Sequence, residues 1–333
     1  MMDKKSLVFL IVVSVIIFSS CSIKQLAIDS LTSSMSATGE PSPFLTEEDP
    51  EFAKQSLPFA LKLYETLLQQ DPQNTQLLLM LAQGFTSYSN AFVEAPAKRL
   101  EINEYDKQQK EFARAKAFYL RAYRYALKSM EIRHKGFSKA WDAQNLELAF
   151  ENIDRDDVDY LYWLGTSLLA AIAIQPSDPA MSIKIPQAVG ACTAVLRLNP
   201  YYSDGAIHEM FIRLYGSLDV SLWWRAIPQE DDIVRKWLVE YYRKNRMEGK
   251  STRELIEFHF KQAITLDEGK KLSPYIAYAQ AVMVPLQDRE GYISILKKAL
   301  EIDTEKYPEY RLENEVARET AIWLIKTVDD IFI

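Results

Sequence analysis

The sequence predicts an all-α protein built from stacked helical hairpins, that is, an α-solenoid. Glycine accounts for only 10 of the 333 residues, and long stretches consist of residues with high helix propensity. Hydrophobic residues recur with the 3.6-residue period of a helix, and no segment shows the sustained two-residue alternation of a strand. Short breaks at Pro, Asp and Gly separate roughly a dozen such segments, which is typical of stacked helical hairpins.

The charge composition of the chain bears on which classes of binding partner to expect. The chain has 39 Lys and Arg residues against 46 Asp and Glu residues, a formal charge of −7. Binding to nucleic-acid phosphates requires a basic face, so we expect no nucleic-acid partner. Apolar residues make up 48% of the chain, enough to bury a large core.

The first twenty residues are typical of a secretory signal. A short polar start with Lys4 and Lys5 precedes an apolar run of about 12 residues, which is shorter than the roughly 20 that span a bilayer. The run ends at Ser19–Ser20–Cys21, which resembles the lipobox of bacterial lipoproteins. We therefore expect residues 1–20 to be a signal peptide and Cys21 to be lipidated. An uncleaved anchor helix and a plain secretory signal are the alternatives.

Two further regions follow the signal. Residues 21–50 are rich in Ser, Thr, Pro and Glu, and we expect a flexible tether that begins at the lipidated Cys21. Residues 51–333 form the expected helical repeat domain. This layout predicts a periplasmic lipoprotein that is attached to a membrane only through its lipid anchor.

Hydrophobic stripes place the helices in order along the chain. The first stripe covers 60–68 and stops at Asp71–Pro72, and the second covers 77–85. A stripe of aromatic and alanine residues follows over 112–126, and a leucine stripe over 161–172 runs toward Gln175–Pro176. The remaining helices are expected at about 182–198, 204–216, 229–247, 251–266, 274–284, 288–302 and 308–328.

Four segments share the spacing of the second helix of a tetratricopeptide repeat, with key positions at offsets 0, 4, 7 and 12. They are Ala60, Tyr64, Leu67 and Pro72; Ala188, Cys192, Val195 and Pro200; Ile256, Phe260, Ala263 and Glu268; and Tyr292, Leu296, Ala299 and Thr304. Small residues let paired helices approach, and a larger residue fills the hole between successive pairs. Cryptic tetratricopeptide-like repeats are therefore expected, and a generic helical bundle is the alternative.

Motifs for catalysis, metal binding or phosphate binding are missing from the sequence. His208–Glu209 lacks the second His of a zinc-protease motif because position 212 is Ile. Acidic pairs such as Asp156–Asp157 stand beside helix ends, where capping explains them. Cys192 is expected to be a small buried hydrophobic residue. We therefore expect no enzymatic activity, no catalytic residue, no metal and no cofactor.

The sequence carries an unusual number of aromatic residues, namely 18 Tyr, 15 Phe and 6 Trp. Several stand beside polar residues, and an apolar body with a polar tip suits the lining of an apolar pocket. Core packing is the alternative role, above all for Trp163 and Tyr278. The residues expected to line a ligand pore or pocket are Tyr88, Asn90, Phe92, Tyr162, Trp163, Tyr278, Gln280 and Gln287.

Four strings, taken together, resemble a known family. They are Leu57–Pro58–Phe59–Ala60–Leu61–Lys62–Leu63–Tyr64–Glu65–Thr66–Leu67–Leu68; Asp157–Val158–Asp159–Tyr160–Leu161–Tyr162–Trp163; Ser273–Pro274–Tyr275–Ile276–Ala277–Tyr278–Ala279–Gln280 with Pro285–Leu286–Gln287–Asp288–Arg289–Glu290; and Arg311–Leu312–Glu313–Asn314–Glu315. Over about residues 50–333 the chain resembles the TatT family, the T component of tetratricopeptide-associated tripartite ATP-independent periplasmic (TRAP) transporters.

This resemblance implies a fold, partners and a function. Family members are periplasmic lipoproteins of cryptic tetratricopeptide repeats that form homotrimers, with a hydrophobic pore or pocket through each protomer. The resemblance implies binding to a substrate-binding P component and to a hydrophobic, lipid-like ligand destined for a membrane permease. The alternative is an envelope scaffold lipoprotein that binds proteins through its repeat groove without a small ligand. The chain departs from the family pattern within 217–251, where Trp223 and Trp224 precede a charged helix.

Overall fold

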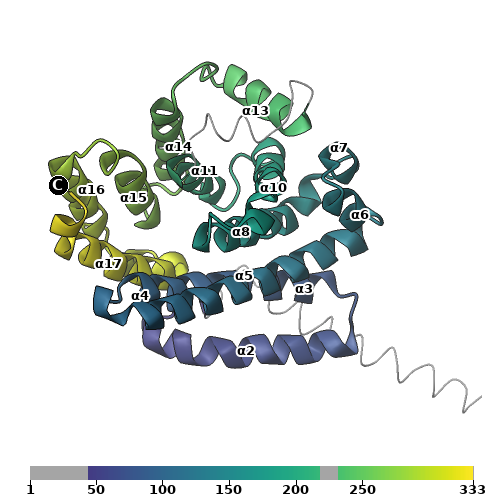
Figure 1. The fold of residues 1–333 in the computed structure, drawn as a ribbon, viewed down its shortest axis with the longest axis horizontal. Coiled ribbons are helices and arrows are strands. Elements are labelled where there is room, and N and C mark those ends of the chain that lie inside the picture. The colour runs from purple at the N-terminus through teal and green to yellow at the C-terminus, as the bar shows by residue number, and fades with distance from the viewer. Residues whose placement is uncertain (1–43, 218–231, 333) are drawn as a thin grey trace, which may run out of the picture.

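The computed structural model describes residues 44–217 and 232–332, which contain helices and no strand (Figure 1). The longer helices are α2 (Pro50–Gln70), α3 (Thr75–Ser89), α5 (Tyr105–Arg133), α8 (Val158–Ile174), α10 (Ile185–Leu198), α11 (Ala206–Ser217), α13 (Ile233–Lys244), α14 (Thr252–Leu266), α16 (Arg289–Leu300) and α17 (Arg311–Lys326). The shorter α-helices are α4 (Ala95–Lys98), α6 (Phe137–Asp142), α7 (Leu146–Ala149), α9 (Pro179–Ser182) and α15 (Ser273–Tyr278). The predicted all-α fold is confirmed.

Short helical turns connect these elements. The π-helical turns are η1 (Asn90–Glu94) and η4 (Ala279–Met283), and the 3-10 turns are η2 (Ile102–Glu104), η3 (Arg155–Asp157), η5 (Thr304–Lys306), η6 (Pro308–Tyr310) and η7 (Val328–Asp330). The predicted signal peptide, Cys21, most of the tether and the aromatic part of the 217–251 segment lie outside the described residues.

Local sequence determines where the helices begin and end. The Asp49 carboxylate accepts hydrogen bonds from the first N–H groups of α2, including Glu51 N–H at 2.9 Å. Ser251 and Glu254 form a capping box at the start of α14, in which each side chain accepts from the backbone N–H of the other. Both α2 and α8 end directly before the two breaks at Asp71–Pro72 and Gln175–Pro176, as the sequence predicts.

The two π-helical turns differ from the sequence expectation, which placed an uninterrupted helix at 274–284. Each turn is followed at the same distance by a proline, Pro96 after η1 and Pro285 after η4. Proline has no N–H to donate, and its ring clashes with the carbonyl group four residues earlier in a regular α-helix. The wider π turn removes this conflict, because the bond before Pro96 runs five residues back, from Ala95 N–H to the Asn90 carbonyl.

Successive helices pack against one another as hairpins, among them α3 with α5, α5 with α8, α8 with α10 and α11 with α14. The tightest approach within the α8–α10 hairpin is at Gly165. A Cβ atom at Gly165 would lie 2.7 Å from Cys192 Sγ and 3.0 Å from the Ala188 carbonyl oxygen. The α8–α10 hairpin therefore depends on small residues at its contact, and Cys192 is fully buried there.

The first three positions of each repeat match are buried or half-buried, including Tyr64, Phe260 and Tyr292, whereas the fourth position is exposed at Pro72 and Glu268. The ring of Phe260 on α14 stacks on Tyr278 with a centroid distance of 4.3 Å and lies 5.4 Å from Tyr275. Phe260 therefore fills the space between α14 and α15. This is the position expected of the large residue between helix pairs, and the assignment to the tetratricopeptide class stays a prediction.

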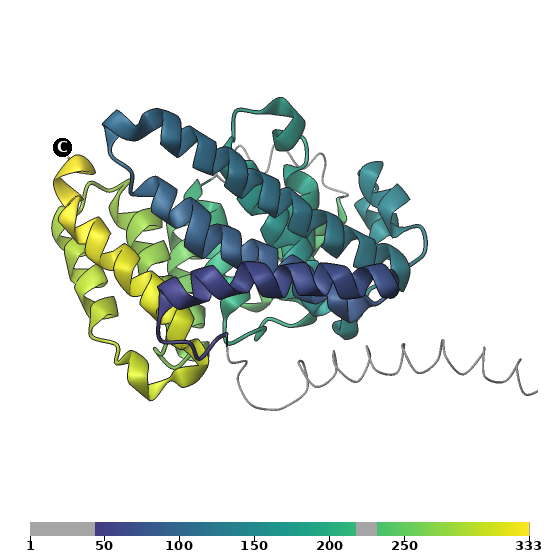
Figure 2. The ribbon, with the colours of Figure 1, turned by 90° about the horizontal axis from the view of Figure 1, so that it is seen from below.

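The stack of hairpins curves until its two ends meet. Figures 1 and 2 both show α17, in yellow, beside the helices of the N-terminal end. The N–H of Leu312 donates to the carbonyl of Leu45 at 3.0 Å. The guanidinium of Arg99, directly after α4, donates to Glu319 and Thr320 of α17, each at 2.9 Å. The described helices therefore form a closed ring, and we call these N-to-C-terminal contacts the seam.

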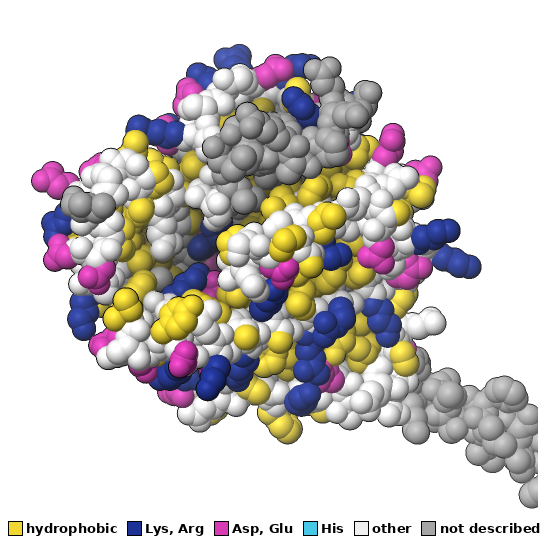
Figure 3. Space-filling view, in the orientation of Figure 1, with side chains coloured by type: hydrophobic (Ala, Val, Ile, Leu, Met, Phe, Trp, Pro, Cys, Tyr) yellow, Lys and Arg dark blue, Asp and Glu magenta, His cyan; other side chains and the backbone are white. Residues whose placement is uncertain are grey.

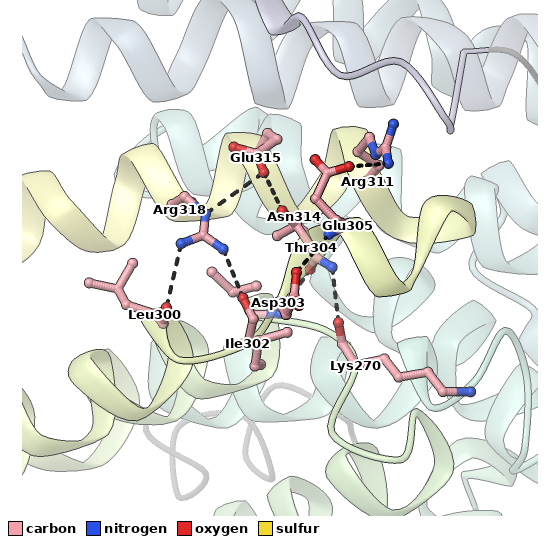
Figure 4. Close-up of polar contacts among 11 residues, drawn as sticks. Lys270, Leu300, Ile302, Asp303, Thr304, Glu305, Arg311, Asn314, Glu315 and Arg318 are labelled. Atoms are coloured by element: carbon pink, nitrogen blue, oxygen red, sulfur yellow. Dashed lines mark hydrogen bonds and ion pairs between the residues drawn. The ribbon is translucent and has the colours of Figure 1, made fainter.

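Polar side chains fix α17 to the loops around it (Figure 4). The buried side chain of Asn314 donates to the carbonyl of Lys270 at 2.9 Å. The guanidinium of Arg318 donates to the carbonyl of Ile302 at 2.8 Å, which satisfies a backbone group just beyond α16. These bonds hold α17 in the orientation that lets it reach the seam.

Candidate ligand-lining surface of the ring

The first group of predicted site residues lies where α3 meets η1. Tyr88 and Phe92 are buried with ring centroids 5.7 Å apart, and Tyr88 also lies 5.9 Å from Phe118 of α5. Asn90 is exposed at the first position of η1. Tyr88 and Phe92 are thus brought together in an aromatic cluster between α3 and α5.

The second group, Tyr162 and Trp163 on α8, is half-buried. The Tyr162 ring lies 5.1 Å from the Trp163 ring and 4.8 Å from the ring of Tyr202. Burial raises the pKa of Tyr162, and the carboxylates of Glu209 on α11 and Glu313 on α17 raise it further. Because these charges act from two other helices, Tyr162 lies within electrostatic range of both α11 and α17.

The third group is spread along α15, η4 and the turn that follows. Tyr278 is buried against Phe260 of the outer helix α14, whereas Gln280 and Gln287 are exposed. Gln287 adopts a left-handed backbone conformation with φ 54°, and its amide donates to the carbonyl of Val284 at 3.2 Å. The structure brings this group together with neither of the other two.

Sequence reasoning missed a polar cluster that joins α11, α15 and α17. On α11, Arg213 donates through Nε and Nη2 to Glu209 Oε1, at 3.0 and 2.7 Å. The hydroxyl of Ser273 on α15 lies 2.7 Å from Glu209 Oε2 and 2.8 Å from Glu313 Oε1 on α17. A hydroxyl has one hydrogen, so Ser273 can donate to only one of the two carboxylates at a time.

Arg213 lies inside the ring rather than on its outer surface. Its side chain is 44% exposed to water, yet desolvation by surrounding protein is the largest influence on its pKa and lowers it. The carboxylate of Glu209, and more distantly Glu94 of η1 and Tyr162 of α8, raise the pKa, and the net direction is upward. A water-accessible group with protein on several sides lines a hollow. Figure 3 shows such a hollow between α15 and α8, with Lys or Arg side chains at its bottom.

Apolar side chains accompany these polar groups on the same helices. Leu169 and Ala170 follow Tyr162 by seven and eight residues on α8, and Met210 lies three residues before Arg213 on α11. Val316 lies three residues after Glu313 on α17, and all four side chains are partly exposed. Residues three, four, seven or eight apart share one face of a helix. The inner surface therefore combines apolar stripes with one polar belt, defined as Glu209, Arg213, Ser273 and Glu313.

Two signals in the sequence point to this belt in hindsight. Glu209 and Arg213 are an oppositely charged i,i+4 pair on a helix that is otherwise largely apolar. Ser273 and Glu313 belong to the strings that carry the family resemblance. The inward direction of these side chains depends on the curvature of the ring, which no single helix shows.

Four buried aromatic residues form a hydrogen-bonded chain behind the inner surface. The chain begins at the hydroxyl of Tyr215, which is bonded to that of Tyr242. His208 Nδ1 of α11 lies 2.7 Å from His259 Nδ1 of α14, and His259 Nε2 lies 2.9 Å from the hydroxyl of Tyr242 of α13. The carbonyl of Pro200 accepts from the remaining nitrogen of His208, so neutral His208 accepts at Nδ1 and His259 donates. Burial lowers the pKa of both histidines, that of His208 to about 4. The chain fastens α13 to α11 and α14.

Within residues 44–217 and 232–332, no three His, Cys, Asp or Glu side chains are grouped so that they could hold a metal ion. In the same ranges, no helix is both long and apolar enough to cross a membrane.

A comparison with known protein families identifies the family of this chain. The model of the TRAP transporter T-component family matches residues 46–222 and 234–332, which is most of the chain. The chain belongs to the TRAP transporter T-component family. This T-component is therefore part of a transport system rather than of a known enzyme family, and a periplasmic or envelope location follows. The unmatched residues 223–233 fall within the 217–251 segment that departs from the family pattern.

This T-component also has a relative in Treponema pallidum (strain Nichols). The two chains are 30% identical over 335 residues, which cover 96% of the T-component and 95% of the relative. The relative is described only as an uncharacterized protein. The likeness thus extends over nearly the full length of both chains.

Proposed function

We propose that this T-component is a periplasmic lipoprotein that binds the substrate-binding P component of its transport system and holds or conducts a hydrophobic ligand. The observation that carries the ligand part of the proposal is the inner surface of the closed ring. In this proposal Tyr162, Arg213 and Glu313 line the surface from three different helices, and the support is their mutual electrostatic influence and the partly exposed apolar side chains on the same helices. The family resemblance supports the P component as the partner and a homotrimer as the assembly.

The inner surface suits a ligand that is mainly apolar and has one polar end. The partly exposed Leu169, Met210 and Val316 can cover an apolar body without a hydrogen-bonding requirement. The polar belt offers an accepting carboxylate at Glu313 and a donating guanidinium at Arg213 to the polar end. Binding and release need no covalent step, which agrees with the expectation that no catalytic residue is present.

Ligand binding is tested with a fluorescent fatty acid titrated into the non-acylated chain that carries Cys21→Ser. Replacement of Trp163 by Ala is expected to weaken binding about tenfold and to change the melting temperature little, because Trp163 is half-buried on the inner helix α8. Tyr278→Ala is measured in parallel to decide whether Tyr278 lines the ligand surface or packs in the core. Weaker binding at an unchanged melting temperature supports the lining role. A lower melting temperature with intact binding assigns Tyr278 to the core. Absence of any binding by the parent favours the scaffold function.

Lipidation of Cys21 is a separate prediction, motivated by the short apolar run that ends at Ser19–Ser20–Cys21. Two or three acyl chains anchor a protein stably because each buried CH₂ contributes about 0.8 kcal/mol. Cells that express the parent should incorporate labelled fatty acid into the protein, and Cys21→Ala should release the protein from the membrane fraction. Unlabelled parent protein, together with unchanged fractionation of the variant, would contradict the prediction.

A further inference from the structure

Helix α5 carries a strong local excess of positive charge in an acidic protein. Its 29 residues contain eight Lys and Arg and three Asp and Glu, a net charge of +5, whereas the whole chain carries −7. Five of the basic residues follow one another at spacings of four, seven, three and four residues, which places them on one face of the helix. This basic stripe consists of Lys110, Arg114, Arg121, Arg124 and Lys128. Figure 3 shows Lys and Arg side chains gathered over this part of the surface.

The charges of the stripe are only partly neutralised. Lys110, Arg124 and Lys128 are exposed and form no ion pair with any residue that the structure describes. Arg114 pairs with Glu111 on its own helix, and Arg121 pairs with Glu65 of α2. Unpaired cations aligned along more than four helical turns create a field that attracts an oppositely charged partner.

Aromatic rings hold part of the stripe in a fixed geometry. The guanidinium of Arg121 lies 4.7 Å from the ring centroid of Phe85, and that of Arg114 lies 5.4 Å from the ring of Phe118. Such stacking fixes the direction of a guanidinium. Both stacked arginines already pair with carboxylates of this chain, so they fix the geometry of the stripe, while Lys110, Arg124 and Lys128 supply its unpaired charge.

A depression of about 480 Å³ lies within the stripe. It is lined by Ala117, Phe118, Arg121, Arg124 and Tyr125. Ala117 stands between the basic residues and leaves room above the helix. An aromatic-walled depression flanked by arginines can receive one protruding side chain of a partner, and aromatic and arginine residues are enriched at the centres of protein interfaces.

We propose that the basic stripe of α5 is the surface on which an acidic face of the P component docks. This inference rests on the proposed function and adds the surface and the charge of the partner. A membrane surface fits the stripe less well as a partner, because helices that lie on membranes expose large apolar side chains beside their basic residues. Tyr105, the first residue of α5, is exposed, but along the stripe itself, from Lys110 to Lys128, no large apolar side chain of α5 is exposed.

The test reverses the charge of the three unpaired residues in the full-length lipidated protein, as Lys110→Glu, Arg124→Glu and Lys128→Glu together. A matched control carries Lys139→Glu, Lys261→Glu and Lys297→Glu, which are exposed positions on three other helices. Both variants change the net charge equally, so only the position of the charges differs. Binding of the purified P component is measured with all three proteins in nanodiscs at low and at physiological salt, and circular dichroism checks the fold.

We expect the stripe variant to bind the P component at least about tenfold more weakly than the parent, with most of the loss in the association rate. The control should bind like the parent, and added salt should weaken the parent more than the stripe variant. Equal binding by parent and stripe variant would overturn the docking surface and leave the proposed function intact. No binding by the parent would overturn both. Reduced association with phosphatidylglycerol vesicles, at unchanged P-component binding, would reassign the stripe to the membrane.

Discussion

Replacement of Asp157 by Ala should lower the free energy of unfolding by about 3–5 kcal/mol. The Asp157 side chain is completely buried where α5 ends and α8 begins. Its carboxylate accepts from Arg133 Nε at 2.6 Å and from the backbone N–H of Asp154 at 2.9 Å, and it lies 2.8 Å from His134 Nε2. Removing it leaves a partly buried guanidinium and a capping N–H without a partner, and both are costly.

The neighbouring Asp156 provides the control for this prediction. Asp156 is exposed and its side chain forms no ion pair with the described residues, so Asp156→Ala should change the unfolding free energy by less than about 0.5 kcal/mol. Urea denaturation followed by circular dichroism measures both variants. Similar values for the two would show that Asp157 contributes only as a helix cap. The sequence pointed to capping for this pair, and the structure adds the ion pair with Arg133.

The second large effect concerns pH. The pKa of His208 is about 6.5 in an unfolded chain and about 4 in the folded protein, so between these values the unfolded chain binds the extra proton. Stability from His208 is therefore complete above pH 6.5 and is lost as the pH falls toward 4, by about 3 kcal/mol in total. His259 acts in the same direction.

Asp267 changes the unfolding free energy in the opposite direction. The pH dependence caused by the histidines is therefore best measured in a variant that lacks the Asp267 carboxylate. The Asp267 side chain is buried, its Oδ2 has no hydrogen-bond partner among the described residues, and burial raises its pKa to about 7. The folded protein therefore gains stability from Asp267 as the pH falls from 7 toward 4.

We expect the unfolding free energy of Asp267→Asn to fall by at least about 3 kcal/mol between pH 6.5 and pH 4, because both histidines contribute, while that of the parent falls less. Urea titrations at intervals across this range measure both proteins. A parent and a variant with parallel pH profiles would contradict the opposition between Asp267 and the two histidines.

The sequence predicted the elements better than their arrangement. Helix ends at Asp71–Pro72 and at Gln175–Pro176 were predictable, because proline acts through local backbone chemistry. The small size of Ala188 and Cys192 followed from the repeat pattern, but their close contact with Gly165 is visible only in the structure. The π turns before Pro96 and Pro285 were not predicted, because periodicity reports the face of a helix and not its hydrogen-bond register.

The candidate site was only partly predictable for a related reason. Tyr162 contacts Tyr202 and lies near carboxylates of α11 and α17, and its role as a lining residue stays a prediction. Tyr278 contacts Phe260 of the outer helix, because a residue's neighbours depend on how the next hairpin turns. Ser273 and Glu313 meet although 40 residues separate them. Such a contact depends on the curvature accumulated over several hairpins, which single-helix patterns do not contain.

The seam changes how the protein folds as a whole. In an open solenoid each repeat touches only its neighbours, so the terminal helices fray and unfolding spreads inward from either end. Here Arg99 contacts Glu319 across 220 residues, and this contact can form only after the hairpins between them are in place. The folded hairpins already hold Arg99 and Glu319 close together, so forming the seam costs little additional loop-closure entropy. The seam in turn stabilises α2 and α17, which would be free ends in an open solenoid. Within the residues that the structure describes, the first and last helices therefore support each other, and the loss of any one hairpin between them should loosen both.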